Sequence, residues 1–456
     1  KESVTNPISI LSTHMKKLFL FAFAAIVMLM SSCSRGDKEL LRAVPEEADA
    51  LMRVDLKAVA KSLGASWTDI LKMTATKANL QDDNCGIDLS GMIYAFVTED
   101  SQMKGVVLPV SDVDDLKALF ERENLALEEN DGIYGYGGSV AFDDTRLVIA
   151  IGPEATAFNL HSLLKRNEVD DDVMKLDKRL DDIGKPISAV YDGEIFKQAV
   201  AHDFTVNMML ASLPFDLDDV FVNIGVDGTE NTMVVDASLV GEDSEAQDQV
   251  DKFKKILKPI KDSKIPFVAD KFLALVATNL HGESLKDMAG MFREFGTDPL
   301  FEALDGLATF TLTGLDLQQE KPAFVFTAQA NDIACLDQLM GNIGKIGISV
   351  KDEGHHSWTI DDGKGDKLLV GAQGGFVFAN YGNGMQRPKG DNTVALEKGT
   401  VFYVKAFPAS IPSANKVDVG FSLQNMQELE LYATDELEAK LTLKSDVAWS
   451  ELINNE

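Results

Sequence analysis

Apolar and polar residues alternate along two separate stretches of the chain. Residues 220–226 carry an apolar side chain at every second position, Asp227 and Gly228 are typical of a turn, and the alternation resumes over 233–239. The same arrangement returns at 429–443. Because side chains of a strand point alternately to its two faces, each stretch predicts a β-hairpin with one buried face.

Other segments have the three-residue spacing of amphipathic helices. Segments 111–119 and 331–339 each begin with a residue type favoured at helix N-termini, and Leu116 and Leu336 hold equivalent apolar positions in them. A Ser-x-x-Gln capping box at 244–247 predicts a further helix.

These elements recur in the same order in the two halves of the chain. Segment 44–49 is similar to segment 265–270, and each leads into an apolar, strand-like run. Segment 89–98 likewise matches 304–313, and the two predicted helices follow at matching places. Three anchors in one order indicate an internal repeat.

The repeat predicts an α+β protein of two similar lobes that arose by internal duplication. Each lobe is expected to be an antiparallel sheet with helices packed on one face, because period-two alternation is typical of such sheets. We place the first lobe at residues 40–258 and the second at 265–456, separated by a polar segment at 258–264.

Near the N-terminus a short apolar core follows two lysines. Lys16 and Lys17 precede thirteen apolar residues at 18–30, and Ser31, Ser32 and Cys33 come next. A membrane-spanning helix needs about 20 apolar residues, so this core is too short to span and is typical of an export signal. The end of the segment resembles the bacterial lipobox, in which a peptidase cuts before a cysteine that then carries a lipid.

This interpretation divides the N-terminal region into three parts. Residues 1–14 are an upstream extension that we expect not to be native, residues 15–32 are a lipoprotein signal peptide, and residues 33–39 are a lipid-anchored tether. Cys33 is the predicted lipidation site and the contact with the membrane. We expect an outer membrane lipoprotein that faces either the periplasm or the cell surface.

Composition limits the partners and the covalent framework. The formal net charge is −30, which repels nucleic acid, so no nucleic-acid partner is expected. Apart from Cys33 the cysteines are Cys85 and Cys335, too few for a disulfide framework. Two unpaired thiols are favoured, with a single bridge as the alternative.

Taken together, these features resemble a family of Bacteroidetes envelope lipoproteins catalogued as a domain of unknown function. The resemblance rests on the lipobox, on segment 44–49 running into 52–56, and on the repeated layout. It extends over nearly the whole chain after Cys33. It implies a lipid-anchored envelope protein but supplies no catalytic residues.

A search for catalytic or metal-binding patterns finds few candidates. His355 and His356 are the only adjacent histidines, and neighbours on a strand point to opposite faces, so no metal site or cofactor is expected there. Trp358 lies beside them, and these three residues are the weak candidates for ligand contact. The acidic runs, including Asp361 to Asp366, lack the ligand order of a calcium loop and are better explained as turns.

The sequence therefore favours a non-enzymatic binding or assembly module, with an envelope protein or glycan as its partner. No catalytic residues are assigned, because no nucleophile–base arrangement is visible. Two alternatives stay open. One is a hydrolase of envelope glycan or peptide that uses a carboxylate pair, and the other is a calcium-dependent adhesin.

Overall fold

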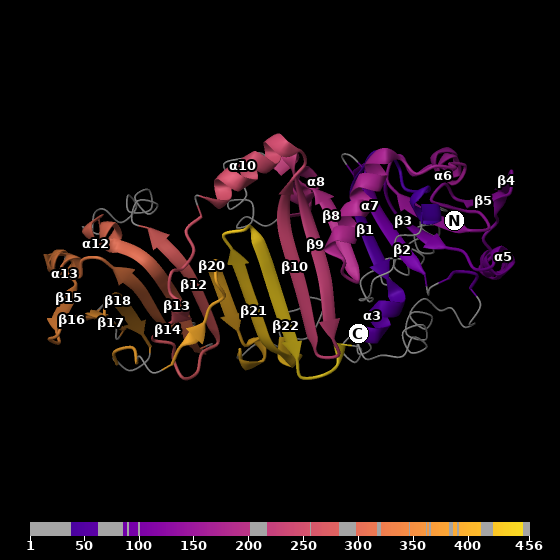
Figure 1. The fold of residues 1–456 in the computed structure, drawn as a ribbon. Helices are drawn as coiled ribbons and strands as arrows, with labels where there is room; N and C mark the ends of the chain where they lie inside the picture. Colours follow the sequence, from indigo (N-terminus) through magenta and orange to yellow (C-terminus); the bar gives the residue numbers. More distant parts are fainter. Residues whose placement is uncertain are drawn as a thin grey trace, which may run out of the picture. The chain divides into compact units, whose positions relative to one another are not determined.

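The computed structural model divides the chain into two units. It describes residues 38–62, 85–88, 91–98, 101–200, 217–255, 257–281, 298–316, 321–345, 347–361, 363, 366–382, 386–389, 392–411 and 423–449. The first unit comprises residues 1–251 together with 447–456, and the second comprises 252–446 (Figure 1).

The first unit is built on one antiparallel sheet. The order of its strands is β10-β9-β8-β1-β2-β3-β7-β6-β5-β4. Its centre, β1 to β3, is apolar on both faces, as the unbroken apolar run of β2 requires. The strands are β1 (Ala48–Asp55), β2 (Met92–Thr98), β3 (Lys104–Pro109), β4 (Glu128–Asn130), β5 (Ile133–Tyr136), β6 (Val140–Phe142), β7 (Arg146–Ile151), β8 (Ile187–Asp192), β9 (Val220–Thr229) and β10 (Thr232–Gly241).

Helices cover both faces of this sheet, not one face as predicted. Helices α2 (Lys38–Leu41), α6 (Ala157–Leu164) and α7 (Asp171–Ile183) pack on the face that carries Leu51 and Phe96. Helix α5 (Val113–Arg122) packs on the opposite face, where Phe120 stacks on Phe142. Both faces of the central strands are apolar, so each needs a cover. The remaining helical segments are α3 (Leu56–Ser62), α8 (Gly193–Val200), the 3₁₀ turn η2 (Leu217–Asp219) and α10 (Ser244–Lys254).

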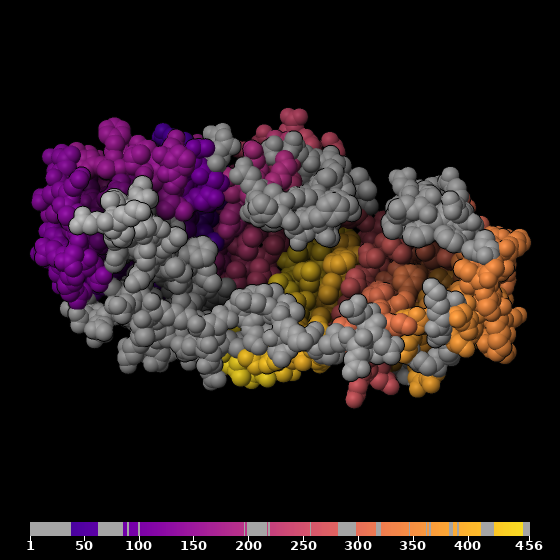
Figure 2. Space-filling view, turned by 180° about the vertical axis from the view of Figure 1, so that it is seen from behind, coloured from indigo at the N-terminus to yellow at the C-terminus, as the bar shows by residue number. Residues whose placement is uncertain are grey.

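The second unit is also built on one antiparallel sheet. The order of its strands is β22-β21-β20-β12-β13-β14-β18-β17-β16-β15. Figure 2 shows the surface that β15 to β18 contribute, in orange. The strands are β12 (Ala274–His281), β13 (Leu304–Asp316), β14 (Lys321–Ala330), β15 (Ser349–Asp352), β16 (Ser357–Asp361), β17 (Lys367–Gln373), β18 (Phe376–Tyr381), β20 (Thr400–Ala406), β21 (Met426–Thr434) and β22 (Glu438–Ser445).

The described residues of this second sheet form two hydrophobic cores. Helices α12 (Asp298–Ala303) and α13 (Cys335–Lys345) cover one core, which includes Leu336 and Trp358. The other core contains Leu275 and Tyr403, next to a short pairing of β11 (Lys264–Ile265) with β19 (Val394–Ala395). The 3₁₀ turns η5 (Pro408–Ser410) and η7 (Leu423–Asn425) complete the described elements.

Most local expectations agree with this fold, and the α+β class with antiparallel pairing is confirmed. Leu116 and Leu336 are each only 1% exposed. The first predicted hairpin was wrong in its turn, which lies at Glu230 and Asn231, because Asp227 and Gly228 pair within the ladder. The capping residue of α10 was also misplaced. Asp243 accepts the first backbone bonds, and its carboxylate competes well for that role.

Candidate functional site

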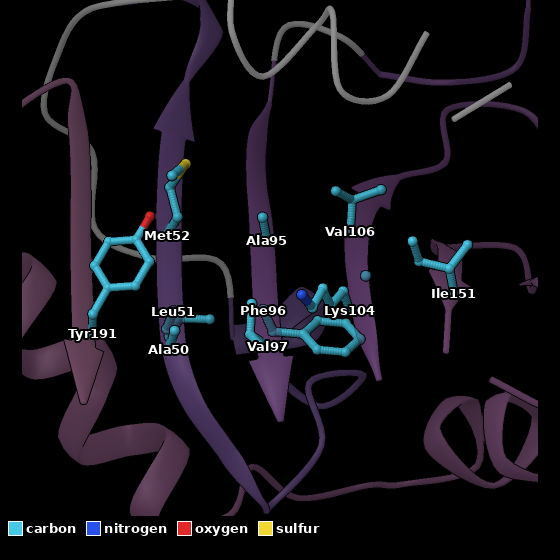
Figure 3. A pocket seen from close by; sticks show the side chains of 11 residues that line it. Ala50, Leu51, Met52, Ala95, Phe96, Val97, Lys104, Val106, Ile151 and Tyr191 are labelled. Atoms are coloured by element: carbon cyan, nitrogen blue, oxygen red, sulfur yellow. The ribbon is translucent and has the colours of Figure 1, made fainter. Parts of the chain in front are cut away.

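A pocket of about 270 Å³ opens on the first unit's sheet (Figure 3). It lies on the face that also carries α5, over the part formed by β8, β1, β2, β3 and β7. Its lining is almost entirely apolar and consists of Ala50, Leu51, Met52, Ala95, Phe96, Val97, Lys104, Gly105, Val106, Ile151 and Tyr191.

The strand register arranges the pocket side chains in two rows. One row runs Met52–Ala95–Val106 across β1, β2 and β3, and Figure 3 shows Ala95 between the other two. The second row runs across five strands, in the order Tyr191, Ala50, Val97, Lys104 and Ile151. Residues of both rows share one face because they are two apart on each strand.

Small side chains in the middle of the rows create the hollow. Ala50 and Ala95 project only a methyl group, whereas Tyr191 and Ile151 are bulky and lie at the two ends of the longer row. Gly105 lies between Lys104 and Val106, and a Cβ there would meet the Phe96 ring on the opposite face at 2.5 Å. Glycine at 105 therefore lets Phe96 pack flat under β3 as part of the core.

Among the pocket residues that the structure describes, Lys104 and Tyr191 carry the polar side-chain groups. The Lys104 side chain is exposed, and Ile151 beside it is 38% exposed, so this end is open to water. At the other end burial raises the pKa of the Tyr191 phenol, which keeps its hydroxyl protonated at neutral pH. The pocket thus offers apolar surface with one cation at its open end.

A buried charged cluster lies on the opposite face of the same sheet. Arg53 of β1 donates to Asp181 of α7 at 2.6 Å and contacts Asp177 at 3.5 Å, and the Tyr94 hydroxyl donates to Asp177 at 3.3 Å. Burial raises the pKa of Asp177 although Arg53 opposes this effect. Because both carboxylates contact the buried Arg53, these ion pairs hold α7 on the sheet.

In the second unit, polar side chains of β20, β21 and β22 pair with one another. Glu428 of β21 accepts from Lys444 at 2.6 Å and lies 3.0 Å from Lys405. Burial acts to raise the pKa of Glu428, but the two lysines hold it below its ordinary value. Tyr403 donates to Glu430 at 2.7 Å. These contacts cross neighbouring strands and strengthen their pairing.

The two cysteines outside the N-terminal region are free. The Cys335 thiol is buried on α13 and donates to the carbonyl of Asp332 at 2.9 Å. Burial raises its pKa, which disfavours the reactive thiolate.

The predicted ligand contacts do not come together at the pocket. His355 and His356 lie exposed in the turn between β15 and β16, both with positive φ near 55°. Arg387 holds this turn through the His355 carbonyl and the Ser357 hydroxyl. Trp358 is 8% exposed and belongs to the core under α13. Cys33, the predicted lipidation site, lies outside the described residues.

The acidic runs serve local backbone roles where the structure describes them. Asp170 caps α7, and Asp361 accepts from the Gly363 amide in the turn after β16. Within the described ranges, no group of three His, Cys, Asp or Glu side chains is placed to hold a metal ion. No helix in that part of the chain has the length and apolar character needed to cross a bilayer.

Sequence analysis did not identify the pocket. Its residues come from five strands spread between positions 50 and 191, and each is unremarkable on its own strand. One signal was available, since two alanines fall on the same face of neighbouring apolar strands. Recognising it required knowledge of which strands pair.

Comparisons with known proteins do not identify a family or a function for this chain. No protein-family model and no curated protein matches the chain. Among solved structures, crystal form III of TP0453 covers 48% of this chain and 86% of its own length at 14% identity, with a TM-score of 0.30. Crystal form I of TP0453 covers 46% and 82% at 12% identity, also with a TM-score of 0.30. Likeness at this level establishes neither a shared family nor a shared function.

Proposed function

We propose that this protein is a non-enzymatic binding module of the cell envelope, tethered to the outer membrane through a lipid on Cys33. Its first unit binds a small apolar ligand. The observation that carries the proposal is the pocket, because apolar side chains from five strands converge there around two alanines. Concave, mostly apolar sites with a few polar groups are the usual form of small-ligand sites.

The pocket's size fits one chain or ring system. Its volume of about 270 Å³ exceeds an apolar cavity of about 150 Å³ that holds one benzene molecule. It lies just below the range of about 300–1,000 Å³ for drug-sized ligands. A whole two-chain lipid would not fit within it.

The alternative functions have a weaker basis. A hydrolase needs a carboxylate pair that is open to substrate. The neighbouring carboxylates of Asp177 and Asp181 instead contact the Arg53 guanidinium. A calcium-dependent adhesin needs converging oxygen ligands. The acidic run at 170–172 instead begins a helix, with Asp170 bonded to the Asp172 amide at 2.8 Å.

We also propose that the two units arose by duplication. In support, the strand orders correspond one to one, with β1 to β3 matching β12 to β14 and β8 to β10 matching β20 to β22. Helix α5 follows β3 as α13 follows β14. A fold-level duplication would let one unit keep a pocket while the other changed.

On this alignment the second unit carries large rings at the pocket positions. Ala95 pairs with Met52 in the first unit, and at the corresponding place in the second unit Phe310 pairs with Val276. Likewise Lys104 pairs with Ile151 in the first unit, and Phe324 pairs with Tyr381 in the second. The three rings of the second unit stack in a row, with centroids 5.3 and 5.6 Å apart. They occupy space that is open in the first unit.

A fluorescence titration tests ligand binding. The full chain is titrated with the apolar dye Nile red, and decanol is then added as a competitor. We expect saturable dye binding that decanol displaces. Ala95→Phe, which introduces the side chain found at position 310, should weaken dye binding at least tenfold because the ring fills the hollow.

The matched control is Ala118→Phe, at an exposed position of α5 outside the pocket. It makes the same change in composition and should leave dye binding as in wild type. Urea unfolding of both variants confirms that they fold. Equal dye binding by folded Ala95→Phe and wild type would rule out the pocket as the site.

A further inference from the structure

The shape of the pocket indicates a thin, extended ligand. From Tyr191 to Lys104 the longer row crosses three strand spacings of about 4.8 Å each, or roughly 14 Å. Ala50 is the smallest residue of this row, and Ala95 in the neighbouring row likewise projects only a methyl group. A single aliphatic chain can lie along such a strip, whereas a broad planar ring system would meet Tyr191 and Met52 at one side.

Lys104 gives one end of this row a positive charge that no carboxylate of the described residues neutralises. Figure 3 shows its side chain lying along the sheet face, with the nitrogen turned toward β2. Some lysines of this unit have carboxylate partners, such as Lys117 with Asp114 at 3.0 Å and Lys165 with Asp131 at 2.7 Å. Among the residues that the structure describes, no carboxylate forms an ion pair with Lys104.

This cation is notable because of its surroundings. The chain carries a formal charge of −30, so its general field repels anions. A carboxylate beside apolar surface loses hydration and needs an opposite charge to stay ionised. Lys104 supplies that charge at the pocket, and the matching position of the second unit holds the uncharged Phe324.

We propose that the ligand is a single aliphatic chain that ends in an anionic group. The chain lies along the row from Tyr191 to Lys104, beside the hollow at Ala50 and Ala95, and the anion pairs with the Lys104 ammonium at the open end. This inference rests on the proposed binding function and names its ligand class. A free fatty acid and a singly acylated anionic lipid share this chemistry.

The test compares three ligands of equal chain length on the full chain by competition with Nile red. The ligands are decanoate, decanol and decyltrimethylammonium. We expect decanoate to bind at least tenfold more tightly than decyltrimethylammonium. Lys104→Met, which keeps the apolar stem, should lose this preference while decanol binding stays unchanged. Raising the salt concentration should weaken decanoate but not decanol, because salt screens exposed charges.

Lys178→Met is the matched control. It removes the same charge from the exposed side of α7, on the other face of the sheet, and should keep the decanoate preference. If decanol binds but decanoate shows no advantage, or if Lys104→Met retains the advantage, the anionic ligand class is wrong and the apolar pocket stands. If none of the three displaces a bound dye, or no dye binds, the proposed function fails as well. A lyso-phosphatidylglycerol arm distinguishes a lipid from a free acid.

Discussion

Arg53 on β1 donates a hydrogen bond to Asp181 on α7 at 2.6 Å, across the interface between sheet and helix in the first unit. The Arg53 side chain is 6% exposed and that of Asp181 is 47% exposed, so the guanidinium is buried and its partner reaches water. Asp177, one helical turn earlier, lies on the same guanidinium. The pair connects the strand at the centre of the sheet to the helix that covers it.

Removing this arginine should destabilise the first unit. Arg53→Met leaves Asp177 buried without its cation, and we expect a loss of about 3 kcal/mol in the free energy of unfolding, at the low end for a broken buried pair because Asp181 is half exposed. The double variant Arg53→Met with Asp177→Asn should recover part of that loss. Urea unfolding measures these two variants and Asp177→Asn alone, which completes the double-mutant cycle. Strictly additive effects would show that the two residues do not interact.

Leu116 and Leu336 should each be far more sensitive to truncation than their neighbours. Both are 1% exposed, so Leu→Ala should cost about 2 to 5 kcal/mol at either site. Asp337→Ala should behave like wild type, because Asp337 is exposed. Lys117→Ala should cause a smaller loss than Leu116→Ala, since Lys117 contacts Asp114 and the Tyr134 ring, 4.3 Å from its centroid. Urea unfolding measures the loss of stability in each variant. If Lys117→Ala loses as much stability as Leu116→Ala, the assignment of the buried face of α5 is wrong.

Acid should destabilise the second unit through Glu428. Its folded-state pKa is lowered from an ordinary value of 4.5, so the unfolded chain binds the proton more readily. The resulting stability is present above about pH 4.5 and is lost as pH falls through the lower, folded-state pKa. Glu428→Gln should therefore flatten the fall in unfolding free energy below pH 4.5.

The control for this pH experiment is Glu438→Gln, an exposed position on the next strand of the same hairpin. It should leave the acid dependence close to that of wild type. An unchanged pH profile in Glu428→Gln would show that Lys405 and Lys444 do not stabilise the charged carboxylate.

The proposed lipid attachment at Cys33 predicts the outcome of a fractionation experiment. Cys33→Ala should still be exported, because the apolar core at 18–30 is intact, but the protein should leave the membrane pellet for the soluble fraction. Cys85→Ala serves as the control and should remain in the pellet. Retention of Cys33→Ala in the pellet at the wild-type level would contradict lipidation.

Periodicity alone located the strands and helices that depend on local pattern. The hairpin at 429–443 pairs in the expected register, with Leu431 opposite Leu441, because alternation fixes which side chains share a face. The buried faces of α5 and α13 followed from spacing in the same way. The turn after β9 did not follow from the pattern. Asp-Gly is a strong turn signal, but Asp227, Gly228 and Thr229 form three further pairs of the ladder.

Tertiary structure alone decided which residues meet. Ala50, Ala95 and Tyr191 are far apart in the chain and line one pocket because β1 pairs with both β2 and β8. Trp449 follows the last strand of the second unit in the sequence but belongs to the first unit. Its backbone amide donates to the carbonyl of Glu230 there. The local pattern determines which side of a strand or helix is apolar. The surface that this side meets depends on long-range pairing, which no short window of sequence records.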